Sequence, residues 1–145
     1  MATQYTLQHA ETDAELAACF ELVQQLRPHL RSAQEFIDQV TTQSTQGYRL
    51  LVVWDGERPV AAAGYRRMDN LIYGAFIYID DLVTDANERG RGHGEQLIEA
   101  VRDLARKQGC AQLVLDTGLA NALAQRFYFR AGLLSRGLHF SMELQ

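Results

Sequence analysis

The stretch that decides the fold is Asp80-Asp81-Leu82-Val83-Thr84-Asp85-Ala86-Asn87-Glu88-Arg89-Gly90-Arg91-Gly92-His93-Gly94-Glu95-Gln96-Leu97. A β-rich apolar run leads into it, three glycines alternate with other residues, and an amphipathic helical pattern follows. The first amides of a helix have no acceptor within the helix and lie at the positive end of its dipole. This strand-to-helix turn therefore predicts a site for phosphate oxygens, with Arg89 and Arg91 adding positive charge.

Two common phosphate-binding motifs do not fit this turn. A Walker loop needs a Gly-Lys-Ser or Gly-Lys-Thr ending, which the stretch lacks. A dinucleotide fingerprint would match Gly90 and Gly92, but Glu95 and Gln96 stand where its third glycine would fall. The turn also follows the fourth predicted strand rather than the first, so both motifs are excluded.

Outward from this stretch, alternating strand and helix patterns predict a mixed α/β or α+β chain with one core. Asp55-Gly56 favours a tight hairpin. The capping box Ser32-Ala33-Gln34-Glu35 predicts the start of a helix, and Asp13 is the expected cap of the helix before it. The predicted strands are 5–9, 48–54, 60–65, 71–84, 113–115 and one or two within 135–144; the predicted helices are 13–27, 32–46, 92–108 and 121–130.

Composition narrows the class of protein further. The 145 residues suit a single domain spanning 1–145, with 47% hydrophobic and 22% charged residues. A net charge of −4 disfavours general nucleic-acid binding. No apolar run approaches the roughly 20 residues of a membrane span, and the start does not read as a signal peptide. Cys19 and Cys110 are predicted to be reduced thiols of a cytoplasmic protein. The histidines lack the spacing of metal ligands, so no metal is expected.

Two linked motifs carry a family resemblance. The pattern Arg-x-x-Gly-x-Gly at Arg89–Gly94 resembles the acetyl-CoA loop of the GCN5-related N-acetyltransferase (GNAT) family. Downstream, the segment Asn121–Leu133 resembles the family signature Asn-x-x-Ala-x-x-Phe-Tyr-x-x-x-Gly-Phe, at the expected distance. Ala86 stands where many members have proline, and Leu133 replaces the usual aromatic residue.

The resemblance implies a mixed central sheet of six to seven strands flanked by about four helices, splayed between strands 4 and 5. The pantetheine arm of acetyl-CoA would lie in that opening, and the diphosphate would lie on the loop amides. The implied acetyl-CoA-binding residues are Leu82, Val83, Thr84, Arg89, Gly90, Arg91, Gly92, His93, Gly94, Glu95 and Asn121.

The resemblance also implies catalytic roles. Tyr128 is the candidate general acid, because a phenol with a pKa of about 10 is protonated at neutral pH and can reprotonate the departing thiolate. Asp80 is the candidate base for the amine, with Asp81 or water as alternatives. Asp81 lies next along the strand and is therefore expected to face the side opposite to Asp80.

The resulting hypothesis is an N-acetyltransferase that moves an acetyl group from acetyl-CoA to a primary amine, by direct attack in a ternary complex. The alternative is a non-catalytic CoA-binding regulatory or sensing module on the same fold. The acceptor is expected to be a small-molecule or peptide amine, and the acidic pair Asp80 and Asp81 weakly favours a cationic one. Neither a membrane nor a nucleic acid is an expected partner, and a homodimer through the tail strands stays open.

Overall fold

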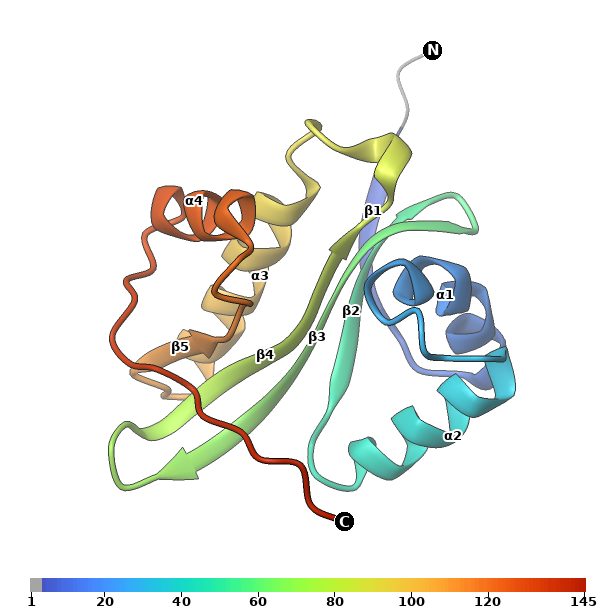
Figure 1. Cartoon of the computed structure of the whole chain (residues 1–145). Helices are drawn as coiled ribbons and strands as arrows, with labels where there is room; N and C mark the ends of the chain where they lie inside the picture. The colour runs from blue at the N-terminus through green and yellow to red at the C-terminus, as the bar shows by residue number, and fades with distance from the viewer. Residues whose placement is uncertain (1–3) are drawn as a thin grey trace. The chain divides into compact units, whose positions relative to one another are not determined.

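The computed structural model describes residues 4–145, shown in Figure 1. It divides into two compact units, one reaching to Val114 and the other covering Leu115–Gln145. The single domain expected from the sequence stays a prediction. The elements are β1 (Tyr5–Ala10), α1 (Asp13–Leu26), α2 (Ala33–Ser44), β2 (Arg49–Asp55), β3 (Arg58–Asn70), β4 (Gly74–Thr84), the 3₁₀ turn η1 (Ala86–Glu88), α3 (His93–Lys107), β5 (Gln112–Leu115) and α4 (Ala122–Arg130).

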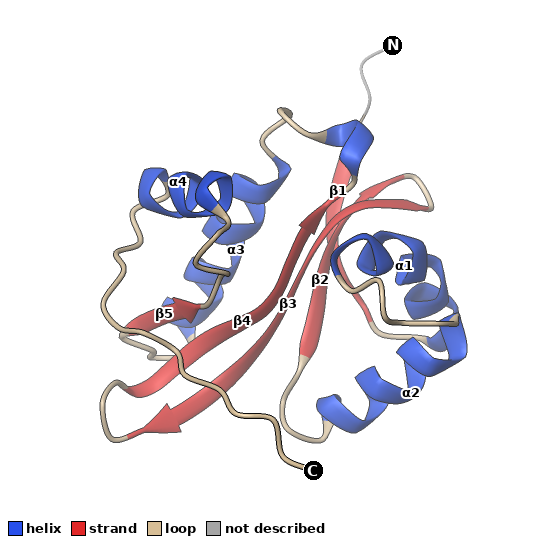
Figure 2. Cartoon of the chain, in the orientation of Figure 1, coloured by secondary structure: helices blue, strands red, loops and turns tan. Residues whose placement is uncertain are grey.

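The strands form one mixed sheet in the order β1-β2-β3-β4-β5. β1 to β4 are antiparallel neighbours, whereas β4 and β5 run parallel. In Figure 2, α1 and α2 lie on one side of the sheet and α3 lies on the other. The parallel pair requires a crossover, and α3 supplies it together with the glycine-rich turn.

The first two helices begin at polar caps, as the sequence predicted, with two differences in detail. Thr12, rather than Asp13, caps α1, and it forms a complete capping box with Glu15. Ser32 caps α2 by accepting a hydrogen bond from the Glu35 amide. The Glu35 carboxylate accepts from the Arg31 backbone instead of from Ser32, so the predicted box is only half formed.

The core has two layers, one on each side of the sheet. On one side, side chains from α1 and α2 pack on alternate residues of the strands, including Leu50, Val52 and Ala62. On the other side, α3 buries its apolar stripe, with Leu97 and Val101 fully buried. Burying each such leucine or valine contributes about 1.5–3 kcal/mol, so both layers hold the central strands in place.

The strand predicted at 71–84 begins three residues later than expected. The side chain of Asn70 accepts hydrogen bonds from the amides of Ile72 and Tyr73, which closes a turn. Gly74, the first residue of β4, then takes a positive φ of +68°. Leu71 and Ile72 are therefore exposed at a hairpin tip, although their residue types favour a strand.

The predicted fold class is confirmed, but the sheet has five strands instead of six to seven. The difference comes from the tail, where no strand forms in the described segment 135–145. Alternating apolar residues at 138, 140, 142 and 144 give that segment a strand pattern, yet these side chains are exposed. A segment with a strand pattern forms a strand only when its backbone N–H and C=O groups pair with a neighbouring strand.

Candidate active site

A β-bulge in β4 arranges the two acidic residues. Gly64 of β3 pairs with Asp81 and the next residue, Tyr65, pairs with Ile79, so Asp80 is an extra residue without an opposite partner. A bulge of this kind interrupts the alternation of side chains. Asp80 and Asp81 are consequently presented on the same side of the sheet as α1 and α2, and the expectation that they face opposite sides is wrong.

The contacts of the two carboxylates agree with this placement. Arg66 donates to both oxygens of Asp80, from Nε at 2.8 Å and from Nη2 at 2.7 Å. Arg27, which follows the last turn of α1, donates from Nε to Asp81 at 3.0 Å and from Nη2 to the backbone oxygen of Asp80 at 2.9 Å. The Tyr48 hydroxyl donates to the other oxygen of Asp81 at 2.8 Å. Each carboxylate is thus matched by one arginine.

A cleft of about 180 Å³ lies between α1, α2 and the sheet, and Asp81 is part of its wall. Tyr48 is 5% exposed at the bottom of the cleft, where its hydroxyl fills the space that a Cβ at position 64 would need. Burial, followed by the charge of Asp81, raises the pKa of Tyr48 well above its usual value, so the phenol stays protonated. The cleft is lined by Val23, Arg27, His29, Leu30, Phe36, Gln39, Val40, Gln43, Tyr48 and Asp81.

Beyond the bulge, successive residues of β4 direct their backbone N–H and C=O groups alternately toward β3 and away from it. Asp85 donates its amide to the Val60 oxygen of β3, and paired residues in an antiparallel ladder alternate between bonded and non-bonded pairs. Val83 therefore directs its backbone groups at Ala62, whereas Leu82 and Thr84 direct theirs away from β3. Of the three residues expected to pair with a pantetheine arm, Val83 has its backbone engaged within the sheet.

The neighbouring strand is too short to cover that edge of β4. β5 has four residues and begins beside the start of β4, where the Ala111 amide donates to the Ala75 oxygen. β4 continues to Thr84. Within the sheet, the outward backbone groups of Leu82 and Thr84 thus have no strand beside them, and the implied splay between strands 4 and 5 stays a prediction.

The glycine-rich turn has the conformation that its sequence predicts. Gly90 and Gly92 take φ values of +81° and +83°, which other residues rarely adopt. Gly92 is the N-cap of α3 and provides no side-chain cap. Among the described residues, no acceptor bonds the amides of residues 91–95, and a Cβ at Gly90 or Gly92 would meet open space. The turn therefore fits a diphosphate.

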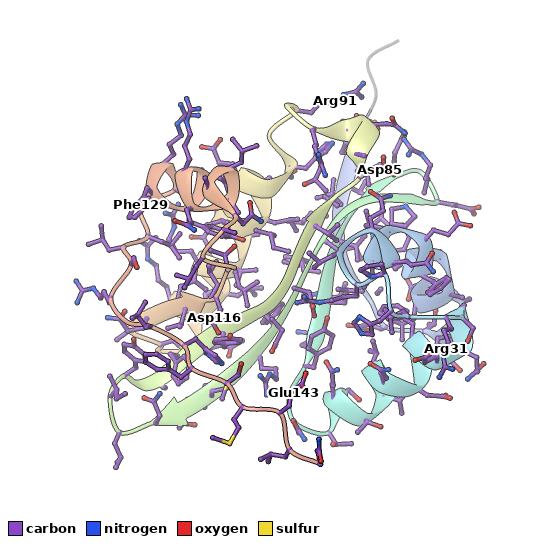
Figure 3. All side chains as sticks on the ribbon, viewed as in Figure 1. Arg31, Asp85, Arg91, Asp116, Phe129 and Glu143 are labelled. Carbon is purple, nitrogen blue, oxygen red and sulfur yellow. The ribbon has the colours of Figure 1, made fainter. Side chains whose placement is uncertain are left out.

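Glu88, which the sequence interpretation did not single out, lies at the centre of a cluster of polar side chains beside this turn. Its carboxylate accepts from Tyr5 Oη at 3.1 Å, Arg58 Nη2 at 2.9 Å and Arg91 Nη1 at 3.0 Å, and lies 3.3 Å from His93 Nε2. Burial raises the pKa of Glu88, but the hydrogen bonds from Arg58, His93 and Tyr5 outweigh burial and lower it. The Arg91 side chain, labelled in Figure 3, is therefore engaged within the protein, while Arg89 makes no such contact among the described residues.

The second unit holds the other two candidate residues. Asn121 caps α4 by accepting from the Ala124 amide at 3.1 Å, which is the ordinary structural use of such a residue. Tyr128 is half-buried and contacts Phe127, with ring centroids 5.5 Å apart. Its hydroxyl has no hydrogen-bond partner in the part of the chain that the structure describes, and burial raises its pKa above the usual value. The Tyr128 hydroxyl is thus protonated at neutral pH and can act as a proton donor.

Two further kinds of feature do not occur within residues 4–145. No group of three or more histidine, cysteine or acidic side chains there could hold a metal ion. None of the helices is both long enough and apolar enough to cross a membrane.

The fold and this turn define a class of protein. The sequence model of the acetyltransferase (GNAT) family matches residues 8–133, and the chain belongs to this family. The predicted family and its class, the N-acetyltransferases, are thereby confirmed.

Among individual relatives, the chain is similar to an uncharacterized N-acetyltransferase, YhdJ, of Bacillus subtilis, with 32% identity over 83 residues. That match covers 57% of this chain and 58% of the relative, and a match to the Arabidopsis thaliana glucosamine 6-phosphate N-acetyltransferase covers only 41% of that protein. A longer match, 25% identical over 130 residues, is to glucosamine 6-phosphate N-acetyltransferase 1 of Dictyostelium discoideum. It covers 86% of this chain and 81% of the relative.

Solved structures resemble the whole chain. A transcriptional regulator from Bacillus halodurans has a TM-score of 0.86 at 21% identity, covering 97% of this chain and 100% of its own. The aminoglycoside N-acetyltransferase AAC(6′)-Iy, solved with CoA, has a TM-score of 0.84 at 17% identity, covering 99% and 97%. At such identities the likeness establishes the fold.

Proposed function

We propose that this protein transfers an acetyl group from acetyl-CoA to a primary amine, with both substrates bound at once. The observation that carries the proposal is the row of amides at residues 91–95, which are unbonded within residues 4–145. This row follows a strand whose outward backbone groups at Leu82 and Thr84 have no neighbouring strand in the described sheet. The amides suit the diphosphate, and the two backbone positions suit the amide groups of the pantetheine arm. Asn121 would bind the same arm.

The reaction needs three proton transfers. Acetyl-CoA supplies an activated thioester carbonyl, to which the neutral amine nitrogen adds while the carbon–sulfur bond breaks. The departing thiolate takes the proton of the Tyr128 hydroxyl, and the acylated nitrogen gives up its surplus proton, which restores the phenol directly or through water. The ammonium form of the amine must lose a proton first, and a carboxylate accepts it directly or through water.

Of the two carboxylates, Asp81 has the stronger structural support as the proton acceptor. It lies in the wall of the cleft, where an amine would enter, whereas Asp80, the candidate chosen from the sequence, is not among the lining residues. Both carboxylates accept hydrogen bonds on each oxygen, Asp81 from Arg27 and Tyr48 and Asp80 from Arg66. We therefore propose that Asp81 accepts the proton and that Asp80 orients Arg66.

The charges of the cleft also bear on the acceptor. The acidic pair weakly favoured a cationic amine, but the ion pairs with Arg66 and Arg27 remove most of that negative field. Besides the ion pair of Asp81 with Arg27, the polar part of the lining consists of His29, Gln39, Gln43 and Tyr48. We propose a small amine with several hydroxyl groups, such as an amino sugar, which the polar lining would hold with hydrogen bonds.

The function is tested by monitoring free thiol from acetyl-CoA in the presence of a panel of amines. The panel contains glucosamine 6-phosphate, aminoglycosides, polyamines, amino acids and peptides with free N-termini. We expect thiol release that depends on the amine and is strongest with an amino sugar. Binding of acetyl-CoA without turnover on any member of the panel would instead support the non-catalytic CoA-binding module.

The role of Asp81 is tested with Asp81→Asn and, as its matched control, Asp80→Asn. Each change removes one carboxylate charge and keeps a side chain of the same size. We expect Asp81→Asn to lower kcat/KM for the amine by about 10²- to 10⁴-fold, and Asp80→Asn by less than tenfold. A larger loss in Asp80→Asn than in Asp81→Asn would return the base to Asp80.

A further inference from the structure

One buried carboxylate connects the sheet to both sides of the helix cap. Glu88 is 4% exposed, and its partners Tyr5 and Arg58 come from β1 and from the start of β3. Its other partners, Arg91 and His93, immediately precede and follow Gly92. The two residues that flank the N-cap are thus fixed to a single anion that the sheet itself holds.

The contacts among the partners strengthen this connection. Arg91 Nη1 also donates to the Tyr5 hydroxyl at 2.9 Å, and the Tyr5 ring meets the His93 ring edge-on with centroids 4.6 Å apart. His93 is itself 3% exposed, so its imidazole cannot leave without opening the cluster. The positive-φ backbone of Gly92 is therefore held from both neighbours rather than left as a free hinge.

We propose that Glu88 is a positioning residue, which fixes the backbone of residues 91–93 so that their amides converge on the diphosphate of acetyl-CoA. This inference rests on the proposed acetyl-CoA site. A turn that is ordered before binding spares the ligand the entropic cost of ordering it, and this raises affinity without any direct contact. Glu88 itself touches no substrate in this role.

If Glu88 acted only through its charge, its removal would change the affinity for a diphosphate in the opposite direction. A binding measurement therefore separates the charge explanation from the positioning explanation. Glu88→Gln removes a negative charge next to Arg58 and Arg91, so the neighbourhood becomes more positive. If Glu88 acted only through its field, a diphosphate would bind this variant more tightly. If Glu88 positions the turn, acetyl-CoA binds it more weakly, because an amide has one acceptor oxygen where the carboxylate has two.

The experiment measures the Kd of acetyl-CoA by calorimetry, which needs no acceptor amine. For Glu88→Gln we expect a Kd about 10- to 100-fold higher than in the wild-type protein. Where turnover is measurable, KM for acetyl-CoA should rise likewise while kcat at saturation stays within about threefold. Tyr5→Phe, which removes one hydroxyl from the cluster and keeps the ring, should raise the Kd about threefold to tenfold and covers the case in which Glu88→Gln does not fold.

The matched control is Asp55→Asn. Asp55 shares Arg58 with Glu88 but bonds to neither Arg91 nor His93 in the described structure, so this change alters the charge equally and leaves the turn held. We expect its Kd within about twofold of wild type. An unchanged or lower Kd in folded Glu88→Gln, or in Tyr5→Phe if Glu88→Gln does not fold, would overturn the positioning role alone. Absence of binding in the wild-type protein would overturn the proposed function and this inference together.

Discussion

Replacing Tyr128 by phenylalanine is expected to slow acetyl transfer by about 10- to 10⁴-fold while the affinity for acetyl-CoA changes little. The change removes a single oxygen, and that hydroxyl makes no hydrogen bond within the described residues. Its loss should therefore leave the fold and the packing on Phe127 intact. The measurement is kcat from thiol release, together with the Kd of acetyl-CoA from calorimetry.

The pH profile gives a second signature of the same residue. The protonated phenol is the active form, and burial raises its pKa above the ordinary value of about 10. Activity should therefore persist on the alkaline side up to that raised pKa and fall beyond it. Tyr73→Phe, at the exposed hairpin tip, is the control for removing a phenol elsewhere. An unchanged kcat in Tyr128→Phe would remove the acid role.

Replacing Gly92 by tryptophan is expected to abolish the stabilisation of the protein by acetyl-CoA. A ligand at 100 times its Kd stabilises the folded state by about 2.7 kcal/mol, which is several degrees in Tm for a protein of this size. Space around Gly92 is open, so the indole would meet no core atoms and would crowd the turn where the diphosphate is proposed to bind. The measurement is the Tm difference with and without acetyl-CoA.

The control must carry the same backbone strain, because Gly92 has a positive φ. Gly109, just after α3, has a φ of +74° and equally open surroundings. Gly109→Trp should lower the unliganded Tm about as much as Gly92→Trp does, yet keep the shift that acetyl-CoA produces. Loss of that shift in both variants, or in neither, would count against the diphosphate site at the turn.

The conformation of the glycine-rich turn could be predicted from the sequence because its cause is local. Positive φ values at Gly90 and Gly92, and free amides at the first turn of a helix, depend on residues only a few positions apart. The same holds for the caps at Thr12 and Ser32, which differ from prediction only in detail.

The geometry of the acidic pair could not be predicted in this way. A bulge is a property of two strands in register: no glycine or proline adjoins Asp80 along the chain, and Gly64, which lies opposite Asp81, belongs to another strand. Glu88 was missed for a related reason. Its partners Tyr5 and Arg58 lie 83 and 30 positions away, so along the chain it is indistinguishable from a solvated loop residue.

The early end of β5 has a consequence for the ligand-free protein. Unpaired N–H and C=O groups along a strand are a template on which another extended chain can add, which is how edge-to-edge aggregation starts. Beyond β5, the outward groups of Leu82 and Thr84 form such a template within the sheet. The unpaired edge that would let the pantetheine arm bind like an additional strand would thus also make the ligand-free protein prone to aggregation. Bound acetyl-CoA would cover this edge and reduce that tendency.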